Sequence, residues 1–257
     1  MSCSPASSTT RHILHHLHLG RIPFTKTGAL QSLLVSKHLR AKASATTSPP
    51  PTLLTSEFNP VYTLGRRETS VTDEQLSHLR YDGKAEVHST LRGGQTTFHG
   101  PGQMTGYLIC DLKSHNLTPR CYIRKLESSI ISLLEKYGVK AFTTEDPGVW
   151  VTTEEKICAV GVHMRRNVTS YGVGLNVNTD LRWLDRIVGC GLVGKRATSL
   201  QRLGVEGKTV EEVAGDWATE LVRTIGMAGT KRVGVEELLG DEEKGAWERG
   251  EVLGKEE

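Results

Sequence analysis

Short segments with the residue types of β-strands follow one another along most of this chain, and they constrain its fold more than any other feature. They are rich in Val, Ile, Thr and aromatic residues, and glycines or charged turns separate them. The predicted strands are 61–65, 86–91, 104–112, 148–153, 156–164 and 170–178. Consecutive strands with helices beside them are typical of an α+β fold, so we predict a mostly antiparallel or mixed sheet flanked by helices.

The clearest helix is predicted over 119–137, where Thr118 can cap the first turn and Gly138 follows the last residue. Its apolar residues recur at helical spacing, which indicates that one face packs on the sheet. Three more helices are predicted: one over 26–41, one after Thr72 and one after Lys208.

Charge and hydropathy exclude two classes of protein. Lys and Arg number 32 and Asp and Glu 29, and the net charge of +3 is too small to favour a nucleic-acid partner. No apolar run approaches the ~20 residues of a membrane-spanning helix, so we expect no membrane span. The five cysteines include no Cys-x-x-Cys pair, so neither a disulfide framework nor a metal site is expected.

The distribution of charge divides the chain into three parts. Residues 1–56 carry six basic side chains and no acid, whereas residues 236–257 carry nine acids and three bases. We predict a flexible start over 1–16, for which a targeting segment is one interpretation because acidic residues are absent. A catalytic domain is predicted over 17–228, followed by an acidic extension over 229–257 that is peripheral or disordered.

The segment RGGQTTFHGPGQ at 92–103 concentrates four glycines, a proline, a histidine and an arginine between two predicted strands. Glycine loses more conformational freedom on folding than other residues, so such a loop is favoured where the backbone approaches a ligand. The alternative is an ordinary hairpin connection. The glycine spacing does not match a dinucleotide-binding motif, and GVEGKT at 204–209 lacks the first glycine of a phosphate-binding loop.

Cys190 differs from the other cysteines because glycines flank it in IVGCGLVGKRATSL. Flanking glycines leave a thiol sterically open, so Cys190 is a candidate nucleophile, and a turn cysteine without a role is the alternative. A reactive thiolate requires a stabilising neighbour. The sequence leaves four candidates for it: His99, Lys156, Lys195 and Arg196. Three other cysteines are predicted to be small buried residues: Cys110, Cys121 and Cys158.

Four segments of the chain occur in the order found in the lipoyl(octanoyl) transferase family. They are RGGQTTFHGPGQ, KICAVGVHMRRNVT, YGVGLNVNTDL and IVGCGLVGKRATSL. LGRIPFTKTGALQ near the start and PVYTLGRRE at 60–68 extend the resemblance over roughly 17–225. The chain therefore resembles this family, and the resemblance implies an α/β-type fold like the catalytic domains of biotin and lipoate protein ligases.

The resemblance also implies an activity, which is the first step in making protein-bound lipoate. The family transfers an octanoyl group from octanoyl-acyl carrier protein to a lysine of a lipoyl-accepting domain, and it uses no ATP or other cofactor. The acceptors are the lipoyl domains of 2-oxoacid dehydrogenase complexes and the glycine cleavage H protein. By motif, Cys190 corresponds to the acyl-accepting cysteine and Lys156 to its partner lysine. We expect a monomer that acts in the mitochondrion, or in the cytoplasm if it is bacterial.

The same matching assigns three segments to the walls of an acyl-binding pocket. Small residues suit this task, because a saturated chain gains affinity mainly from apolar burial. The implied substrate-binding residues are Arg92, Gly93, Gly94, Gln95, Thr96, Thr97, Phe98, His99, Ala159, Val160, Gly161, Gly172, Val173 and Gly174. The chain departs from the family at Tyr171, where a histidine is common, and at Phe98, where a tyrosine is more usual.

Two other functions remain open from the sequence. One is an ATP-dependent lipoate or biotin protein ligase of the same fold, although such enzymes do not require a cysteine in the position of Cys190. The other is a non-catalytic module that binds lipoyl domains or acyl carrier protein. If the partners are acidic, basic side chains would contact them. The candidate docking residues are Arg124, Arg165, Arg166, Arg182 and Arg186.

Overall fold

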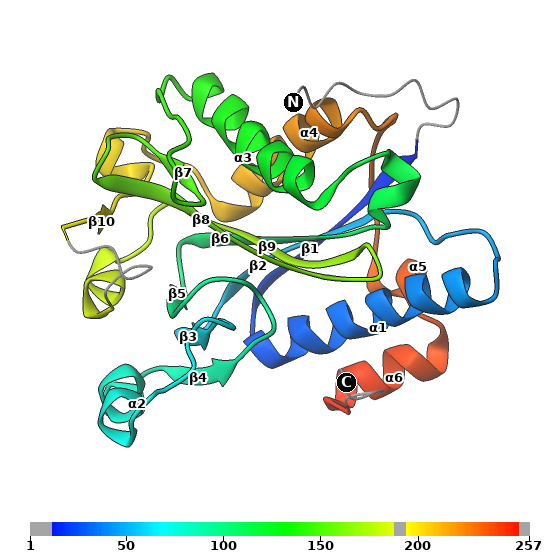
Figure 1. The fold of residues 1–257 in the computed structure, drawn as a ribbon, viewed down its shortest axis with the longest axis horizontal. Coiled ribbons are helices and arrows are strands. Elements are labelled where there is room, and N and C mark those ends of the chain that lie inside the picture. Colours follow the sequence, from blue (N-terminus) through cyan, green and yellow to red (C-terminus); the bar gives the residue numbers. More distant parts are fainter. Residues whose placement is uncertain (1–11, 188–193, 252–257) are drawn as a thin grey trace.

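A computed structural model describes residues 12–187 and 194–251 of the chain. Its main sheet contains the strands β10, β8, β9, β6, β2, β1 and β11 in this spatial order, and β7 pairs with β8 outside that path (Figure 1). The strands are β1 (Ile13–Ile22), β2 (Thr52–Phe58), β6 (Gln103–Ile109), β7 (Val149–Trp150), β8 (Glu155–Arg165), β9 (Val168–Asn176), β10 (Arg196–Ala197) and β11 (Gly229–Arg232).

The main sheet is mixed. Its centre is antiparallel, because β9 pairs with both β8 and β6, and β6 pairs in turn with β2. Parallel pairs lie towards both edges, where β1 joins β2 and β11 and where β10 joins β8. The predicted mixed sheet with flanking helices is therefore confirmed.

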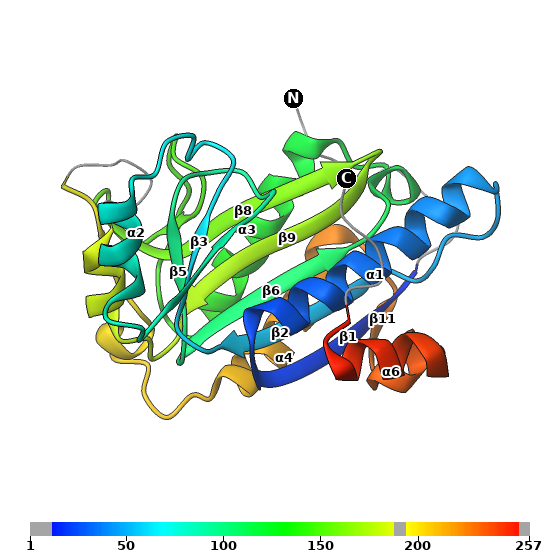
Figure 2. The ribbon, with the colours of Figure 1, turned by 90° about the horizontal axis from the view of Figure 1, so that it is seen from below.

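A second, smaller sheet lies beside one end of the main sheet (Figures 1 and 2). It has the order β4 (Glu86–Ser89), β3 (Val61–Leu64) and β5 (Thr97–His99), and α2 (Asp73–Arg80) packs near β4. The glycine-rich segment connects the two sheets, because β5 ends at His99 and β6 of the main sheet begins at Gln103.

Helices cover both faces of the main sheet (Figure 2). On one face lie α3 (Pro119–Lys136) and α4 (Val210–Ile225), and on the other lie α1 (Phe24–Ala43), α5 (Val235–Leu238) and α6 (Asp241–Arg249). Each face has its own apolar core, one built around Trp217 and Leu126 and the other around Phe58 and Leu30. Because side chains of a strand alternate between faces, the same strands contribute to both cores.

The local signals for helix ends are confirmed. Thr118 accepts a hydrogen bond from the backbone N–H of Cys121 at the start of α3. Thr209 and Glu212 form the capping box of α4, and Thr72 caps α2 with Gln75. Each of these signals depends only on residues within one helical turn, which is why the sequence indicates them clearly.

Two strands of the main sheet include residues outside the predicted domain of 17–228. β1 begins at Ile13, within the segment predicted as a flexible start, and buries His16. β11 lies within the predicted acidic extension and pairs with β1. The sequence did not predict these strands, because HILHHLH is rich in histidine and GTKR is polar. Whether such segments form strands depends on pairing with distant residues. The helix α6 lies outside α1, where Trp247 donates to the backbone oxygen of Lys26 at 2.8 Å.

Candidate active site

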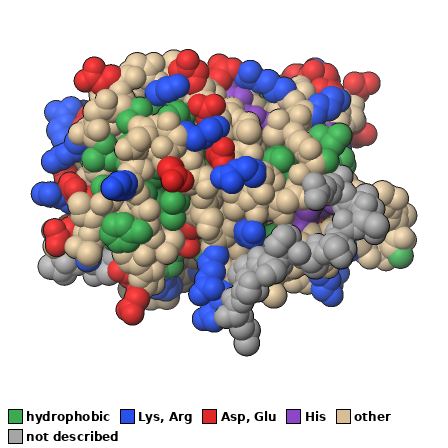
Figure 3. Space-filling view, turned by 90° about the horizontal axis from the view of Figure 1, so that it is seen from above, with side chains coloured by type: hydrophobic (Ala, Val, Ile, Leu, Met, Phe, Trp, Pro, Cys, Tyr) green, Lys and Arg blue, Asp and Glu red, His purple; other side chains and the backbone are tan. Residues whose placement is uncertain are grey.

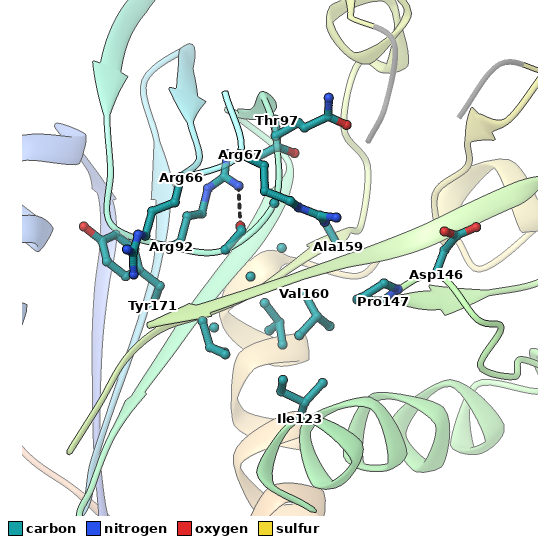
Figure 4. A pocket seen from close by; sticks show the side chains of 18 of the residues that line it. Arg66, Arg67, Arg92, Thr97, Ile123, Asp146, Pro147, Ala159, Val160 and Tyr171 are labelled. Atoms are coloured by element: carbon teal, nitrogen blue, oxygen red, sulfur yellow. Dashed lines mark hydrogen bonds between the residues drawn. The ribbon is translucent and has the colours of Figure 1, made fainter. Parts of the chain in front are cut away.

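A cavity of about 680 Å³ lies where the glycine-rich loop crosses β8 and β9 of the main sheet (Figure 4). It brings together most of the residues that the sequence assigned to the site. Those that line it are Arg92, Gly93, Gly94, Gln95, Thr97, His99, Lys156, Ala159, Val160, Gly161, Gly172, Val173 and Gly174. The loop segment is far in the chain from the other two, which lie side by side because β8 and β9 form a hairpin.

Small residues form the floor of the cavity in matched pairs. Ala159 pairs with Gly174, and Gly161 pairs with Gly172 across the two strands. A Cβ atom on Gly172 would lie 2.2 Å from the backbone oxygen of Gly106, so this position excludes any side chain.

Atoms of the glycine-rich segment lie close above two other floor positions. A Cβ atom would lie 3.2 Å from the backbone oxygen of Gly93 at Gly161, and 3.1 Å from Oε1 of Gln103 at Gly174. Small residues here therefore allow the loop and a ligand to approach the two strands closely.

Arg92 fixes the loop above this floor. Its side chain is buried, and its guanidinium donates to the backbone oxygen of Thr63 at 2.6 Å and to the Thr63 hydroxyl at 2.8 and 3.1 Å. A further N–H donates to the backbone oxygen of Gly93 at 3.0 Å (Figure 4). The N–H of Gly93 in turn donates to the backbone oxygen of Val162 on β8. Arg92 thus joins the loop to β3, and Gly93 joins it to the main sheet.

His99 faces the cavity as a neutral base. Its burial, with a smaller contribution from the charge of Arg92, lowers its pKa from 6.5 to about 4. Nδ1 lies 2.6 Å from Oε1 of Gln103, whose amide nitrogen donates to Asn176 at 2.9 Å. Because that oxygen can only accept, Nδ1 carries the proton and Nε2 retains its lone pair. A neutral imidazole cannot supply the positive charge that a thiolate needs.

Lys156 provides a cation at one end of the cavity. Its Nζ donates to the backbone oxygen of Pro147 at 3.1 Å and lies 4.5 Å from the ring centre of Trp150. Trp150 is buried, and its indole N–H donates to the backbone oxygen of Asp146. These contacts hold the ammonium group in place, because a cation is attracted to the face of an aromatic ring.

A second cavity of about 190 Å³ adjoins the first and shares Lys156, Thr97, Ala159 and Gly174 with it. The other two basic candidates, Lys195 and Arg196, line only this second cavity. Lys195 donates to the backbone oxygen of Thr153 at 2.6 Å, and Arg196 pairs with Glu155 at 3.0 Å. Lys156 is therefore the one of the four candidates that is basic and borders both cavities.

The predicted nucleophile Cys190 lies outside the described residues. Ile187 and Lys195, which stand before and after the undescribed segment 188–193, both line the second cavity. Cys110 and Cys158 are buried as predicted. Burial raises the pKa of Cys110 to about 12 and raises that of Cys158 well above its ordinary value, so neither is a reactive thiolate at neutral pH.

Cys121 differs from its predicted burial. It is half-buried in the first turn of α3, where the neighbouring Tyr122 takes the buried position.

Two of the predicted pocket residues do not line the large cavity. Phe98 is buried on the opposite side of β5 from His99, since neighbouring residues of a strand face opposite ways. Its ring stacks on Trp183 with 5.2 Å between the centroids. Thr96 lines the second cavity, and its hydroxyl donates to the carboxylate of Glu68 at 2.7 Å.

Sequence reasoning missed several lining residues. The exposed pair Arg66 and Arg67 reaches the cavity from the turn after β3, and their N–H groups donate to Arg92 and Gly94 of the loop at 3.0 Å. The motif PVYTLGRRE contains both arginines and could have indicated them. The other missed residues are Tyr107, Ile123, Glu145, Asp146, Pro147, Val162 and Tyr171.

Two of the predicted docking arginines are engaged within the protein. Arg182 forms an ion pair with Asp180 at 2.6 Å, and Arg186 donates to the backbone oxygen of His78 and stacks over the ring of Tyr81. Figure 3, which views the face that α3 covers, shows Lys and Arg side chains interspersed with Asp and Glu rather than gathered in one patch.

Two features are absent from the part of the chain that the structure describes. None of its helices combines the length and apolar character that a membrane crossing requires. Within the same residues, no group of three or more His, Cys, Asp or Glu side chains could hold a metal ion.

Comparison with solved structures identifies the fold. A bipartite lipoate protein ligase of Thermoplasma acidophilum superimposes with a TM-score of 0.67 at 16% identity, covering 95% of this chain and 99% of that one. A lipoate-protein ligase A bound with ATP gives a TM-score of 0.66 at 14% identity, with 93% and 94% covered. The predicted likeness to a lipoate ligase catalytic domain is therefore confirmed.

Sequence comparison narrows the class. The family model "Lipoyl protein ligase A/B catalytic domain" matches residues 28–222. The "Probable octanoyltransferase" of Schizosaccharomyces pombe is 50% identical over 196 residues, which are 75% of this chain and 87% of that protein. The mitochondrial octanoyl-acyl-carrier-protein:protein N-octanoyltransferase LIPT2 of Danio rerio is 41% identical, with 76% and 84% covered. The chain therefore belongs to the octanoyltransferase family of enzymes.

Proposed function

We propose that this enzyme transfers an octanoyl group from octanoyl-acyl carrier protein to a lysine of a lipoyl-accepting domain, through a thioester on Cys190. The observation that carries the proposal is the cavity floored by Ala159, Gly161, Gly172 and Gly174, with the ammonium group of Lys156 at one end. A floor of small residues suits a saturated chain, which has no hydrogen-bonding group beyond its carbonyl. The names of the relatives at 41% and 50% identity support the same transfer.

The first half-reaction moves the acyl group to the enzyme. The Cys190 thiolate attacks the carbonyl carbon of the donor thioester, the new C–S bond forms, and the carrier thiolate leaves. One thioester replaces another, so the step is close to isoenergetic and needs no ATP. The charge of Lys156 favours the thiolate over the thiol, and its N–H groups can protonate the departing carrier sulfur.

The second half-reaction releases the acyl group as an amide. The acceptor lysine attacks the Cys190 thioester as a neutral amine, the C–N bond forms, and the Cys190 thiolate leaves. The attacking nitrogen loses a proton, for which Lys156 in its neutral form and Nε2 of His99 are the nearby bases in the cavity. The amide is more stable than the thioester, and this difference drives the transfer.

The proposed acceptors are the lipoyl domains of 2-oxoacid dehydrogenase complexes and the glycine cleavage H protein. We propose that the enzyme acts in the mitochondrion as a monomer, with the part of residues 1–16 that precedes β1 as a targeting segment. Relatives of Danio rerio and Homo sapiens that carry the word mitochondrial in their names support this location.

A comparison of two cysteine variants tests the proposal. Cys190→Ser is expected to reduce transfer from octanoyl-acyl carrier protein to a lipoyl domain by at least 10³-fold, since a hydroxyl is a weaker nucleophile than a thiolate. Cys158→Ala removes a thiol buried outside the cavity and serves as the matched control. Wild-type rates in the Cys190→Ser protein would contradict the mechanism. Release of pyrophosphate from lipoate and ATP would instead identify a ligase.

A further inference from the structure

The large cavity ends at a wall of two tyrosines. On the described strands of the main sheet, its lining stops at Val162 on β8, at Tyr107 on β6 and at Tyr171 on β9. These positions lie together, because Val162 pairs with Tyr171 and Tyr107 pairs with Gly172. Figure 4 shows Tyr171 on one side of the cavity and Pro147, which accepts a hydrogen bond from the active-site lysine, on the other.

Contacts on several sides hold Tyr171 in this place. Its backbone has a φ of 57°, which is rare for a residue with a side chain. Its N–H donates to Oε1 of Gln31 on α1 at 2.6 Å. Its ring lies edge-on to that of Tyr107 with 5.6 Å between the centroids, and only 7% of the residue is exposed. The wall is therefore a fixed part of the fold.

Packed core lies behind the two tyrosines. Tyr107 and Tyr171 both belong to the apolar cluster between α1 and the main sheet, which also contains Leu30 and Leu34. Protein interiors have few voids larger than a water molecule. A ligand that reached this wall could continue in the same direction only by displacing Tyr171 or the side chains of α1.

The length of the cavity floor matches an octanoyl group. Gly174 lies beside the active-site end of the floor, and Tyr171 stands three residues away on β9, a distance of ~10 Å at about 3.3 Å per residue. Seven C–C bonds of about 1.5 Å in a staggered zigzag span ~9 Å. An eight-carbon chain with its carbonyl carbon near Ala159 and Gly174 therefore ends at Tyr171. A twelve-carbon chain laid along the same path would extend about 5 Å further, past Tyr171.

We propose that Tyr171 sets the maximum length of the acyl group that the enzyme accepts, acting as the end wall of the acyl-binding cavity. The proposal rests on the proposed function, because it places the acyl carbonyl at the Lys156 end. A steric stop is needed at this end, since the contacts that a longer chain gains along an open groove would otherwise favour it.

The test compares donors of different length on variants at residue 171. Tyr171→Gly removes the ring and leaves a residue that readily adopts positive φ, whereas Tyr171→Phe keeps the ring and removes only the hydroxyl. The full chain is assayed with octanoyl-, decanoyl- and dodecanoyl-acyl carrier protein. Tyr171→Gly is expected to raise the ratio of kcat/KM for decanoyl over octanoyl by about fifteenfold, at about fourfold per newly accommodated methylene. Tyr171→Phe is expected to keep the wild-type ratio.

A second variant and a binding measurement keep the test decisive. If Tyr171→Gly does not fold, Tyr171→Asn shortens the same side chain with a residue that tolerates the left-handed region. A folded Tyr171→Gly or Tyr171→Asn protein that kept the wild-type length ratio would overturn the proposal. If the wild-type enzyme transferred no acyl group, the proposed function would fail separately. Stabilisation against heat by dodecanoate in Tyr171→Gly, and not in the wild type, would still support the wall.

Discussion

The two ends of the large cavity are built from different chemistry. At one end Lys156 lies over Trp150, and the cavity continues into a second one that Lys195 and Arg196 also line. At the other end Tyr107 and Tyr171 close the space against the core beneath α1. The first end supplies a positive charge, and the second supplies an apolar wall that limits the space. We infer that changes at the first end alter rate, while changes at the second alter the choice of acyl group.

The largest expected effect is at the charged end. Lys156→Met removes the cation and the proton donor, and we expect the transfer rate to fall by about 10²–10⁴-fold, the usual contribution of a positioned acid or base. The matched control is Lys195→Met, which removes a lysine that also lies near Trp150 but borders only the second cavity. Single-turnover assays measure the rate of octanoyl transfer in both variants. Equal losses in the two variants would contradict the assignment to Lys156.

A smaller effect concerns the neutral histidine between the two ends. Burial lowers the pKa of His99 to about 4 in the folded protein, against 6.5 for an exposed histidine. The unfolded chain therefore binds more protons between these values, so His99 contributes stability above pH 6.5 that is lost as the pH falls towards 4. This contribution reaches about 3 kcal/mol. His99→Gln is expected to flatten the fall in the free energy of unfolding between pH 6.5 and 4.

His38 provides the matched control for that experiment. Burial lowers its pKa to about 4 as well, but it lies on α1 and does not line the large cavity. His38→Gln should flatten the same pH dependence of stability and leave octanoyl transfer unchanged. His99→Gln should flatten the pH dependence and also reduce transfer. An unchanged pH dependence in the two variants would show that these histidines are not neutral in the folded protein.

The smallest expected effect is a change in KM when the exposed arginines beside the large cavity are removed. The exposed Arg66 and Arg67 reach the cavity, whereas Arg182 is already paired with Asp180. For acidic protein substrates, we expect Arg66→Ala with Arg67→Ala to raise KM about three- to tenfold at low salt, and Arg182→Ala to change it less than twofold. Steady-state titration of the carrier protein at two ionic strengths measures this. A KM that is indifferent to salt in the wild type would rule out electrostatic docking.

Features set by neighbouring residues could be predicted from the sequence, whereas features set by distant contacts could not. Thr118 and Thr209 cap their helices as expected, because a cap depends on the next three residues. Strand β11 was missed, because the polar sequence GTKR forms a strand only through its pairing with β1. The loop with His99 was predicted through its motif. The burial of Phe98 away from the cavity depends on Trp183, and the position of Tyr171 depends on α1.

The most direct measurement for the central claim is the intact mass of the purified enzyme after brief incubation with octanoyl-acyl carrier protein. We expect a mass increase of one octanoyl group that maps to Cys190, disappears when a lipoyl domain is added, and is absent from Cys190→Ser. Transfer to the lipoyl domain at full rate in that variant, with no acylated enzyme at any time, would contradict a covalent route through this cysteine.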